Sequence, residues 1–125
     1  MNKAMILKGF QEAMLWASND ERDNEHENLD ETCTIEDITV DANKKIMIII
    51  DDFLKNSKLT LDMIKADEDQ VGHDLFLTAK GFSVGFWDRP HYYPNGLHLT
   101  LSAWCDDYRY NIEPYINAEN KVELN

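Results

Sequence analysis

The chain has 125 residues, 43% of them hydrophobic, and carries 24 acidic against 12 basic side chains, for a formal net charge of −12. This length suits a single domain over residues 1–125, and the apolar content is sufficient for a core. The acidic balance argues against direct binding to nucleic acid or to anionic membranes. The longest apolar run, residues 46–50, is far shorter than the roughly 20 residues that span a bilayer.

Residues 3–17 show the pattern of an amphipathic helix, with Trp16 at the edge of its apolar stripe. Lys8 interrupts the apolar N-terminus, so we expect no secretory signal and a cytoplasmic location, with Cys33 and Cys105 as reduced thiols. The predicted buried stripe consists of Ile6, Leu7, Phe10, Ala13, Met14 and Ala17.

An acidic segment follows the first helix. Residues 20–41 hold ten acidic side chains and a single basic one, Arg22, so most of the net charge lies here. The composition predicts a mobile acidic loop at about residues 19–34. Residues 34–37, TIED, predict a short helical turn with Thr34 as its cap.

The second helix is expected over residues 41–56, with Asp41 as its N-cap. Its apolar run at 46–50 predicts that more than one face is covered, and a strand is the alternative there. Residues 60–66 predict another short helix. Residues 67–70 begin a further turn, which Gly72 could end with a positive φ.

Two segments after Gly72 predict a β-hairpin. Residues 73–78, HDLFLT, are rich in strand formers, and residues 82–87, FSVGFW, alternate in polarity. Between them lies Gly81, at which a positive φ is cheap.

The C-terminal region contains a second predicted hairpin. Residues 112–116 and 121–124 form its strands around a turn at 117–120, and Pro114 suits an edge strand. Residues 97–107 fit two patterns: alternating leucines predict a strand, whereas the wider apolar spacing predicts a helix.

Residues 72–78, with Gly81 and residues 85–89, GFWDR, resemble a family of small tailed-phage proteins that carries a GHDFWLTRxGHGxGFWDR-like hairpin. The resemblance covers about residues 60–124 and includes a following helix and a terminal hairpin. It implies a helix over residues 98–107 and a phage context, and it implies no catalytic residue. The chain departs from the family pattern near Ala79 and Phe82, where the family has a basic residue and a second histidine.

The acidic segment suggests nucleic-acid mimicry as a function. In an extended chain, alternate residues recur every ~6.6 Å, close to twice the ~3.4 Å rise per strand of DNA. Such a strip could occupy the basic groove of a host enzyme that handles nucleic acid, and exposed aromatic residues could add interface anchors. The partner-binding candidates are Asp20, Glu21, Asp23, Glu25, Glu27, Trp87 and Tyr92.

A metal-dependent hydrolase or a nucleotide-binding protein is the alternative. The open ends of the first predicted hairpin would bring together His73, Asp74, Asp88 and His91, residue types that ligate zinc or transfer protons. Because side chains alternate along a strand, His73 and Asp74 would point to opposite faces, which weakens this reading.

The sequence therefore predicts an α+β fold in which two main helices pack on a small antiparallel sheet built from two β-hairpins. The first functional hypothesis is a non-enzymatic phage-type protein, without cofactor, that binds a host or phage protein with a basic surface. A structural or assembly accessory protein is a further alternative.

Overall fold

The computed structural model describes residues 1–20, 22, 27–108 and 112–125, without the side chains of 106–108. Helices dominate this part of the chain, and one two-stranded antiparallel sheet accompanies them, so the α+β class is confirmed. The α-helices are α1 (Lys3–Ala17), α2 (Val40–Met63), α3 (Glu68–Lys80) and α4 (Leu97–Tyr108). The strands are β1 (Pro114–Ile116) and β2 (Val122–Leu124), and the short 3-10 helices are η1 (Leu29–Glu31), η2 (Ile35–Asp37) and η3 (Phe86–Asp88).

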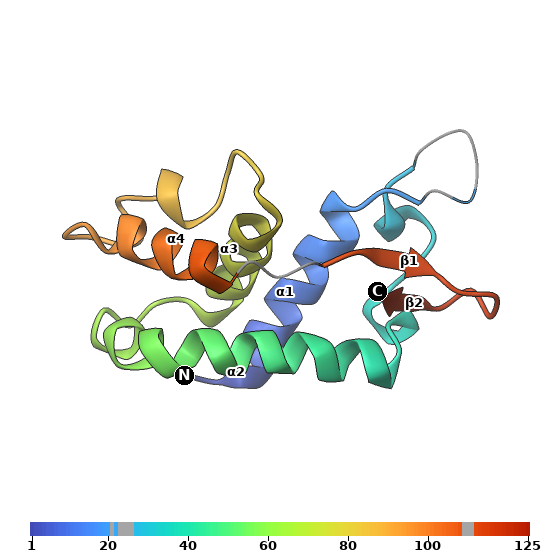
Figure 1. Ribbon diagram of the computed structural model, residues 1–125, viewed down its shortest axis with the longest axis horizontal. Coiled ribbons are helices and arrows are strands. Elements are labelled where there is room, and N and C mark those ends of the chain that lie inside the picture. The colour runs from blue at the N-terminus through green and yellow to red at the C-terminus, as the bar shows by residue number, and fades with distance from the viewer. Residues whose placement is uncertain (21, 23–26, 109–111) are drawn as a thin grey trace.

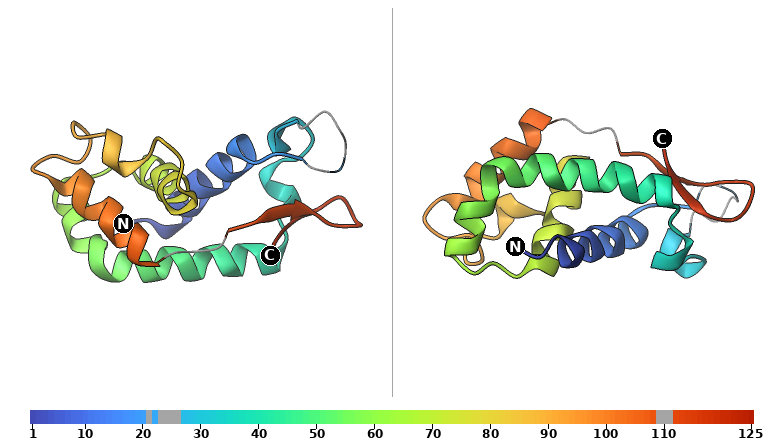
Figure 2. Two further views of the ribbon diagram at one scale, coloured as in Figure 1. Left: turned by 45° about the horizontal axis from the view of Figure 1, so that its top comes forward. Right: turned by 90° about the horizontal axis from the view of Figure 1, so that it is seen from below.

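Helix α2 runs along one side of the molecule, and the other elements gather at its two ends (Figures 1 and 2). The hairpin of β1 and β2 lies near the start of α2, whereas α3, α4 and η3 lie near its end. Helix α1 joins the two groups and packs closely on α3. The buried apolar side chains of all these elements form one cluster.

The first predicted helix is confirmed as α1. The side chain of Asn2 accepts hydrogen bonds from the backbone of Ala4 and Met5, which satisfies two of the unpaired N–H groups at the start of the helix. Ile6 and Phe10 of the predicted stripe are fully buried, while Trp16 is 57% exposed at its edge.

Helix α2 begins after Thr39 and continues to Met63. The side chain of Thr39 caps the helix by accepting a hydrogen bond from the backbone N–H of Ala42. The short helix expected at 60–66 is therefore the last part of α2. The reason is that the buried stripe continues through Ser57 and Leu61 at helical spacing, so nothing breaks the pattern. Ile48 is 66% exposed, so the apolar run is covered on fewer faces than expected.

The first predicted hairpin is wrong. Residues 73–78 lie inside α3, which Asp67 caps at its N-terminus and Gly81 ends in the left-handed conformation with φ 82°. Residues 82–85 form a loop that leads into η3, which contains Phe86 and Trp87. Burial against α1 at the helical spacing of Val71, Leu75 and Phe76 overrides their strand propensity. The described sheet consequently consists of one hairpin rather than two.

The helix and the hairpin predicted in the C-terminal region are both present. Residues 97–108 form α4, the helix that the family resemblance implied. Strands β1 and β2 pair in antiparallel register, with Pro114 opposite Leu124 and Ile116 opposite Val122. Val122 also bridges to Ile38 ahead of α2, which ties the hairpin to the core.

Two glycines bring α1 and α3 into backbone contact. A Cβ atom added to Gly9 would lie 2.0 Å from the carbonyl oxygen of Asp69, and one added to Gly72 would lie 2.1 Å from that of Ile6. Both distances are shorter than any real contact, so only glycine allows this approach. Gly72 thus lies within α3 and does not end a turn, and its φ is not positive.

Candidate functional site

Two hollows meet on the face formed by α1 and α3, and we call them together the α1–α3 groove. The first, of about 500 Å³, is lined by Glu12, Leu15, Trp16, Asp30, Cys33, Thr34, Ile35, Glu36 and His73. The second, of about 490 Å³, is lined by Trp16, His73, Leu77, Val84 and Arg89. Because Trp16 and His73 line both hollows, these two side chains stand at the junction of the groove.

The groove combines an apolar wall with an acidic rim. Trp16 exposes more than half of its surface and Val84 exposes 38%. Glu12, Asp30 and Glu36 contribute three carboxylates to the first hollow, whose lining includes no lysine or arginine among the described residues. The first hollow therefore favours a ligand that is both apolar and positively charged.

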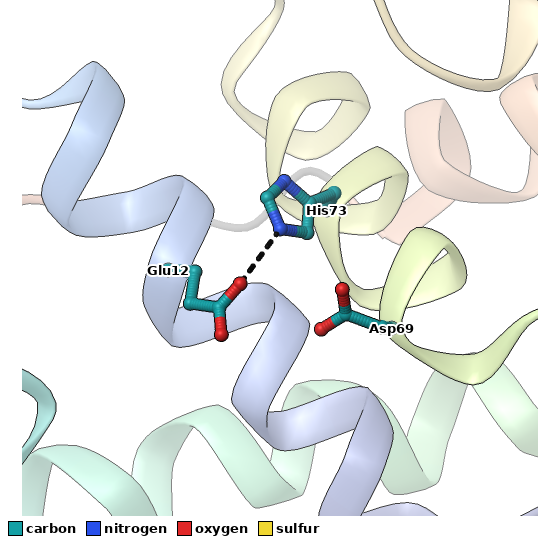
Figure 3. A group of neighbouring side chains, drawn as sticks. All are labelled: Glu12, Asp69 and His73. Carbon is teal, nitrogen blue, oxygen red and sulfur yellow. Dashed lines mark hydrogen bonds and ion pairs between the residues drawn. The ribbon is translucent and has the colours of Figure 1, made fainter.

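Three side chains converge at the junction (Figure 3). Glu12 projects from α1, while Asp69 and His73, four residues apart, project from the same face of α3. The Nε2 atom of His73 lies 3.3 Å from Oε2 of Glu12. One potential ligand atom from each of the three residues lies within 4.8 Å of the others.

Asp74 faces away from the groove and is fully buried. Its carboxylate accepts hydrogen bonds from Nε of Arg89 at 2.8 Å and from the hydroxyl of Tyr93 at 2.7 Å. The amide of Gln70 donates a third, at 3.1 Å. Burial raises the pKa of Asp74, against the opposing effect of these donors, and burial together with the Asp74 carboxylate raises the pKa of Tyr93. Because three donors share this buried carboxylate, the network connects α3 to Arg89 and Tyr93.

The metal cluster predicted from the hairpin is wrong. His73 faces the groove and Asp74 the interior, while Asp88 accepts a hydrogen bond from the backbone N–H of Gly85 at 2.9 Å and His91 is exposed. The predicted hairpin would have brought these four residues together. The segment instead forms a helix followed by a loop, so they do not form one cluster. Of the four, only His73 belongs to a group of three or more potential metal ligands within the described residues.

The first residue of the predicted acidic strip, Asp20, is buried rather than exposed. Asp20 is only 3% exposed, so its prediction as a surface contact is wrong. Its carboxylate accepts hydrogen bonds from Nε and Nη2 of Arg22, the shorter at 2.7 Å, and these bonds lower its pKa to about 2. Glu27 is half-buried, and Glu21, Asp23 and Glu25 lie outside the described residues.

The predicted aromatic contacts are exposed but separate from the groove. Trp87 exposes 47% and Tyr92 exposes 56% of its surface, and neither lines the two hollows. Their role in partner binding stays a prediction.

Sequence reasoning missed Glu12, Trp16 and Asp69 as site residues. Glu12 and Trp16 are four residues apart in a correctly predicted helix, so their shared face was readable. The pairing of Asp69 with His73 required residues 68–80 to be recognised as a helix, for which the cap at Asp67 and the glycine at 81 were the available signals.

No family model, curated protein or solved structure matches this chain. The resemblance to the phage family thus remains a prediction, and function is argued from the site. None of the helices in the described part of the chain has both the length and the apolar composition of a membrane span.

Proposed function

We propose that this protein is a binding protein without catalytic activity, and that its α1–α3 groove takes a basic, amphipathic segment of a partner protein. The observation that carries the proposal is Trp16, an indole 57% exposed between two hollows. Trp16 differs from the other exposed apolar side chains because it lines two adjoining hollows, the second together with Val84, and so forms part of a concave apolar surface. Tryptophan is also among the residues most enriched at binding hot spots.

The charge of the groove defines the partner. Three carboxylates line the first hollow, and the whole chain carries a net charge of −12. Lysine and arginine side chains along a partner helix would meet this rim, while apolar side chains from the same helix would pack on Trp16 and Val84. The charges speed association and select against acidic partners, and the apolar contacts hold the complex.

The mimicry hypothesis was built on an extended acidic strip that began at Asp20. Asp20 is paired with Arg22 and is therefore not a partner contact in our proposal. The proposed acidic contacts are the rim residues Glu12, Asp30 and Glu36. Binding to this rim does not require the acids to have the regular spacing of DNA phosphates. The proposed ligand is therefore a basic segment with a matching apolar face, from any partner protein.

A displayed library of lysine- and arginine-rich amphipathic helices tests this proposal. We expect the untagged protein to select such peptides from the library. The Trp16→Ala variant should bind the selected peptides with an affinity about tenfold or more lower, a loss of at least about 1.4 kcal/mol in binding free energy. Leu59→Ala is the control, because it removes an exposed apolar side chain that lines neither hollow. Equal binding by Trp16→Ala and the wild type, or selection of no peptide, would refute the proposal.

A further inference from the structure

We propose that Glu12, Asp69 and His73 form a binding site for a divalent transition-metal ion, with Zn²⁺ as the ion that fits best. The inference is independent of the partner segment proposed above, because it concerns one cluster at the junction of the groove. The cluster provides one imidazole nitrogen and two carboxylate oxygens from two helices (Figure 3).

The ligand chemistry selects the class of ion. Imidazole together with carboxylate suits Zn²⁺ and its neighbours in the first transition series, whereas Mg²⁺ and Ca²⁺ prefer oxygen ligands alone. Two carboxylates and a neutral imidazole also balance the charge of a divalent ion. The groups are half-exposed rather than deeply buried, with 37% of the Glu12 side chain and 30% of the His73 side chain accessible, so an ion can enter from solvent.

The distances suit coordination after a small adjustment. Zinc lies about 2.0–2.2 Å from nitrogen and oxygen ligands, so two ligand atoms on a tetrahedral ion are no more than about 3.6 Å apart. His73 Nε2 and Glu12 Oε2 already lie within that limit, at 3.3 Å. The three ligand atoms lie within 4.8 Å of one another, so coordination requires a carboxylate side chain to turn toward the imidazole.

Asp69 supplies a second and independent observation. Its Oδ1 atom is buried and finds no hydrogen-bond partner among the residues that the structure describes. A buried carboxylate oxygen without a partner is costly, and such orphans in native proteins call for an explanation, of which a bound ion is one. Coordination at this cluster would compensate the desolvation of Asp69 and relieve its repulsion with Glu12.

The backbone under the three ligands is closely packed. Gly9 lies three residues before Glu12 and contacts the carbonyl of Asp69 itself, while Gly72 immediately precedes His73 and contacts α1. These two contacts leave little freedom for the helices to slide. Ligands supported in this way are preorganised, which reduces the entropy lost when an ion binds.

Lys8 is the competing cation at this cluster. Its Nζ atom lies 3.8 Å from Oε1 of Glu12, on a side chain that is 56% exposed. An exposed ion pair of this length contributes little to stability, because water screens it. The lysine can therefore turn into solvent when a divalent ion binds to the opposite oxygen of Glu12.

Bound zinc would connect α1 to α3 and keep coordination positions open toward the groove. Three protein ligands leave at least one position for water or for a donor from a bound molecule. Because the ion would bind the folded chain in preference to the unfolded chain, it would also stabilise the fold.

Equilibrium dialysis of the untagged, chelator-treated protein against Zn²⁺, with metal analysis, tests the site. We expect one zinc ion per chain, and a dissociation constant raised by about tenfold or more in each of Glu12→Gln, Asp69→Asn and His73→Gln. The visible absorption of Co²⁺ should report binding with a nitrogen ligand and should lose intensity in His73→Gln. Excess Mg²⁺ should not compete.

Two control variants complete the experiment. His91→Gln removes an exposed histidine outside the cluster, and Glu36→Gln removes a rim acid of the same hollow, so both should bind zinc like the wild type. Circular dichroism checks the fold of each variant; if Asp69→Asn fails to fold, Glu12→Gln, at a half-exposed position, decides. Unchanged affinity in the folded cluster variants, or loss of zinc in His91→Gln instead, would overturn the assignment.

Discussion

The carboxylate of Asp74 and the guanidinium of Arg89 meet at 2.8 Å, across the 15 residues that separate them in the chain. The pair connects the two halves of the motif that the sequence analysis assigned to paired strands. Asp74 lies on α3, and Arg89 directly follows η3. A side-chain ion pair thus holds together segments that were expected to be joined by a ladder of backbone hydrogen bonds.

Removal of Asp74 should destabilise the protein strongly. We expect Asp74→Ala to lower the free energy of unfolding by about 3–5 kcal/mol, because Arg89, Tyr93 and Gln70 all lose their acceptor. Tyr93→Phe removes only one of these bonds and should cost about 1.5–3 kcal/mol. Urea denaturation measures both. Asp88→Ala, beside Arg89 and exposed, is the control, and an equal cost for Asp74→Ala and Asp88→Ala would contradict this account.

The glycine contacts between α1 and α3 should not tolerate a methyl group. Alanine normally stabilises the interior of a helix relative to glycine by about 1 kcal/mol. At Gly72 and Gly9 we expect the opposite, a loss of about 1–3 kcal/mol or more, because the added Cβ meets backbone that cannot move aside. Thermal unfolding measures this loss. Gly81→Ala is the comparison: it has open space, so only its positive φ should cost about 1–2 kcal/mol. Stabilisation by Gly72→Ala would disprove the close approach.

Acidification should weaken the contribution of Asp20. Its pKa in the folded chain is about 2, below the ordinary value of 3.8, because Arg22 donates hydrogen bonds to it. A carboxylate with a lowered pKa stabilises the fold above its ordinary pKa and loses that contribution as the pH falls through the folded value. The wild type should therefore be more stable than Asp20→Asn at neutral pH, and the difference should shrink between about pH 4 and pH 2. Denaturant unfolding across this range measures it; a constant difference would count against the ion pair.

The acidic rim should control the salt dependence of partner binding. Glu36 is exposed at the edge of the first hollow, so Glu36→Lys should weaken the binding of a selected basic peptide and flatten its dependence on ionic strength. Isothermal titration at low and high salt gives both quantities. Asp41→Lys changes an exposed acid that does not line the groove and makes the matched control. Equal effects of the two variants would indicate that net charge, rather than the groove, governs binding.

Much of the helical framework was readable from local signals. The apolar stripe of α1, the core of α2 and the cap at Thr34 all depend on residues within a few positions of one another. Thr34 indeed begins η2, with its N–H donating to Asp37 at 2.8 Å. The final hairpin followed from its turn residues, of which Asn120 adopts a φ of 62°.

Local sequence patterns account for α1, most of α2, the helical turn at Thr34 and the C-terminal hairpin, because each depends on contacts within its own segment. Residues 68–80 required the tertiary structure, because their local helix signals at Asp67 and Gly81 compete with a strand propensity that burial against α1 and the backbone contacts of Gly72 overcome. The same packing positions Glu12 beside His73 and leaves Trp16 exposed. The candidate site therefore arises from the contact between α1 and α3, which neither segment encodes alone.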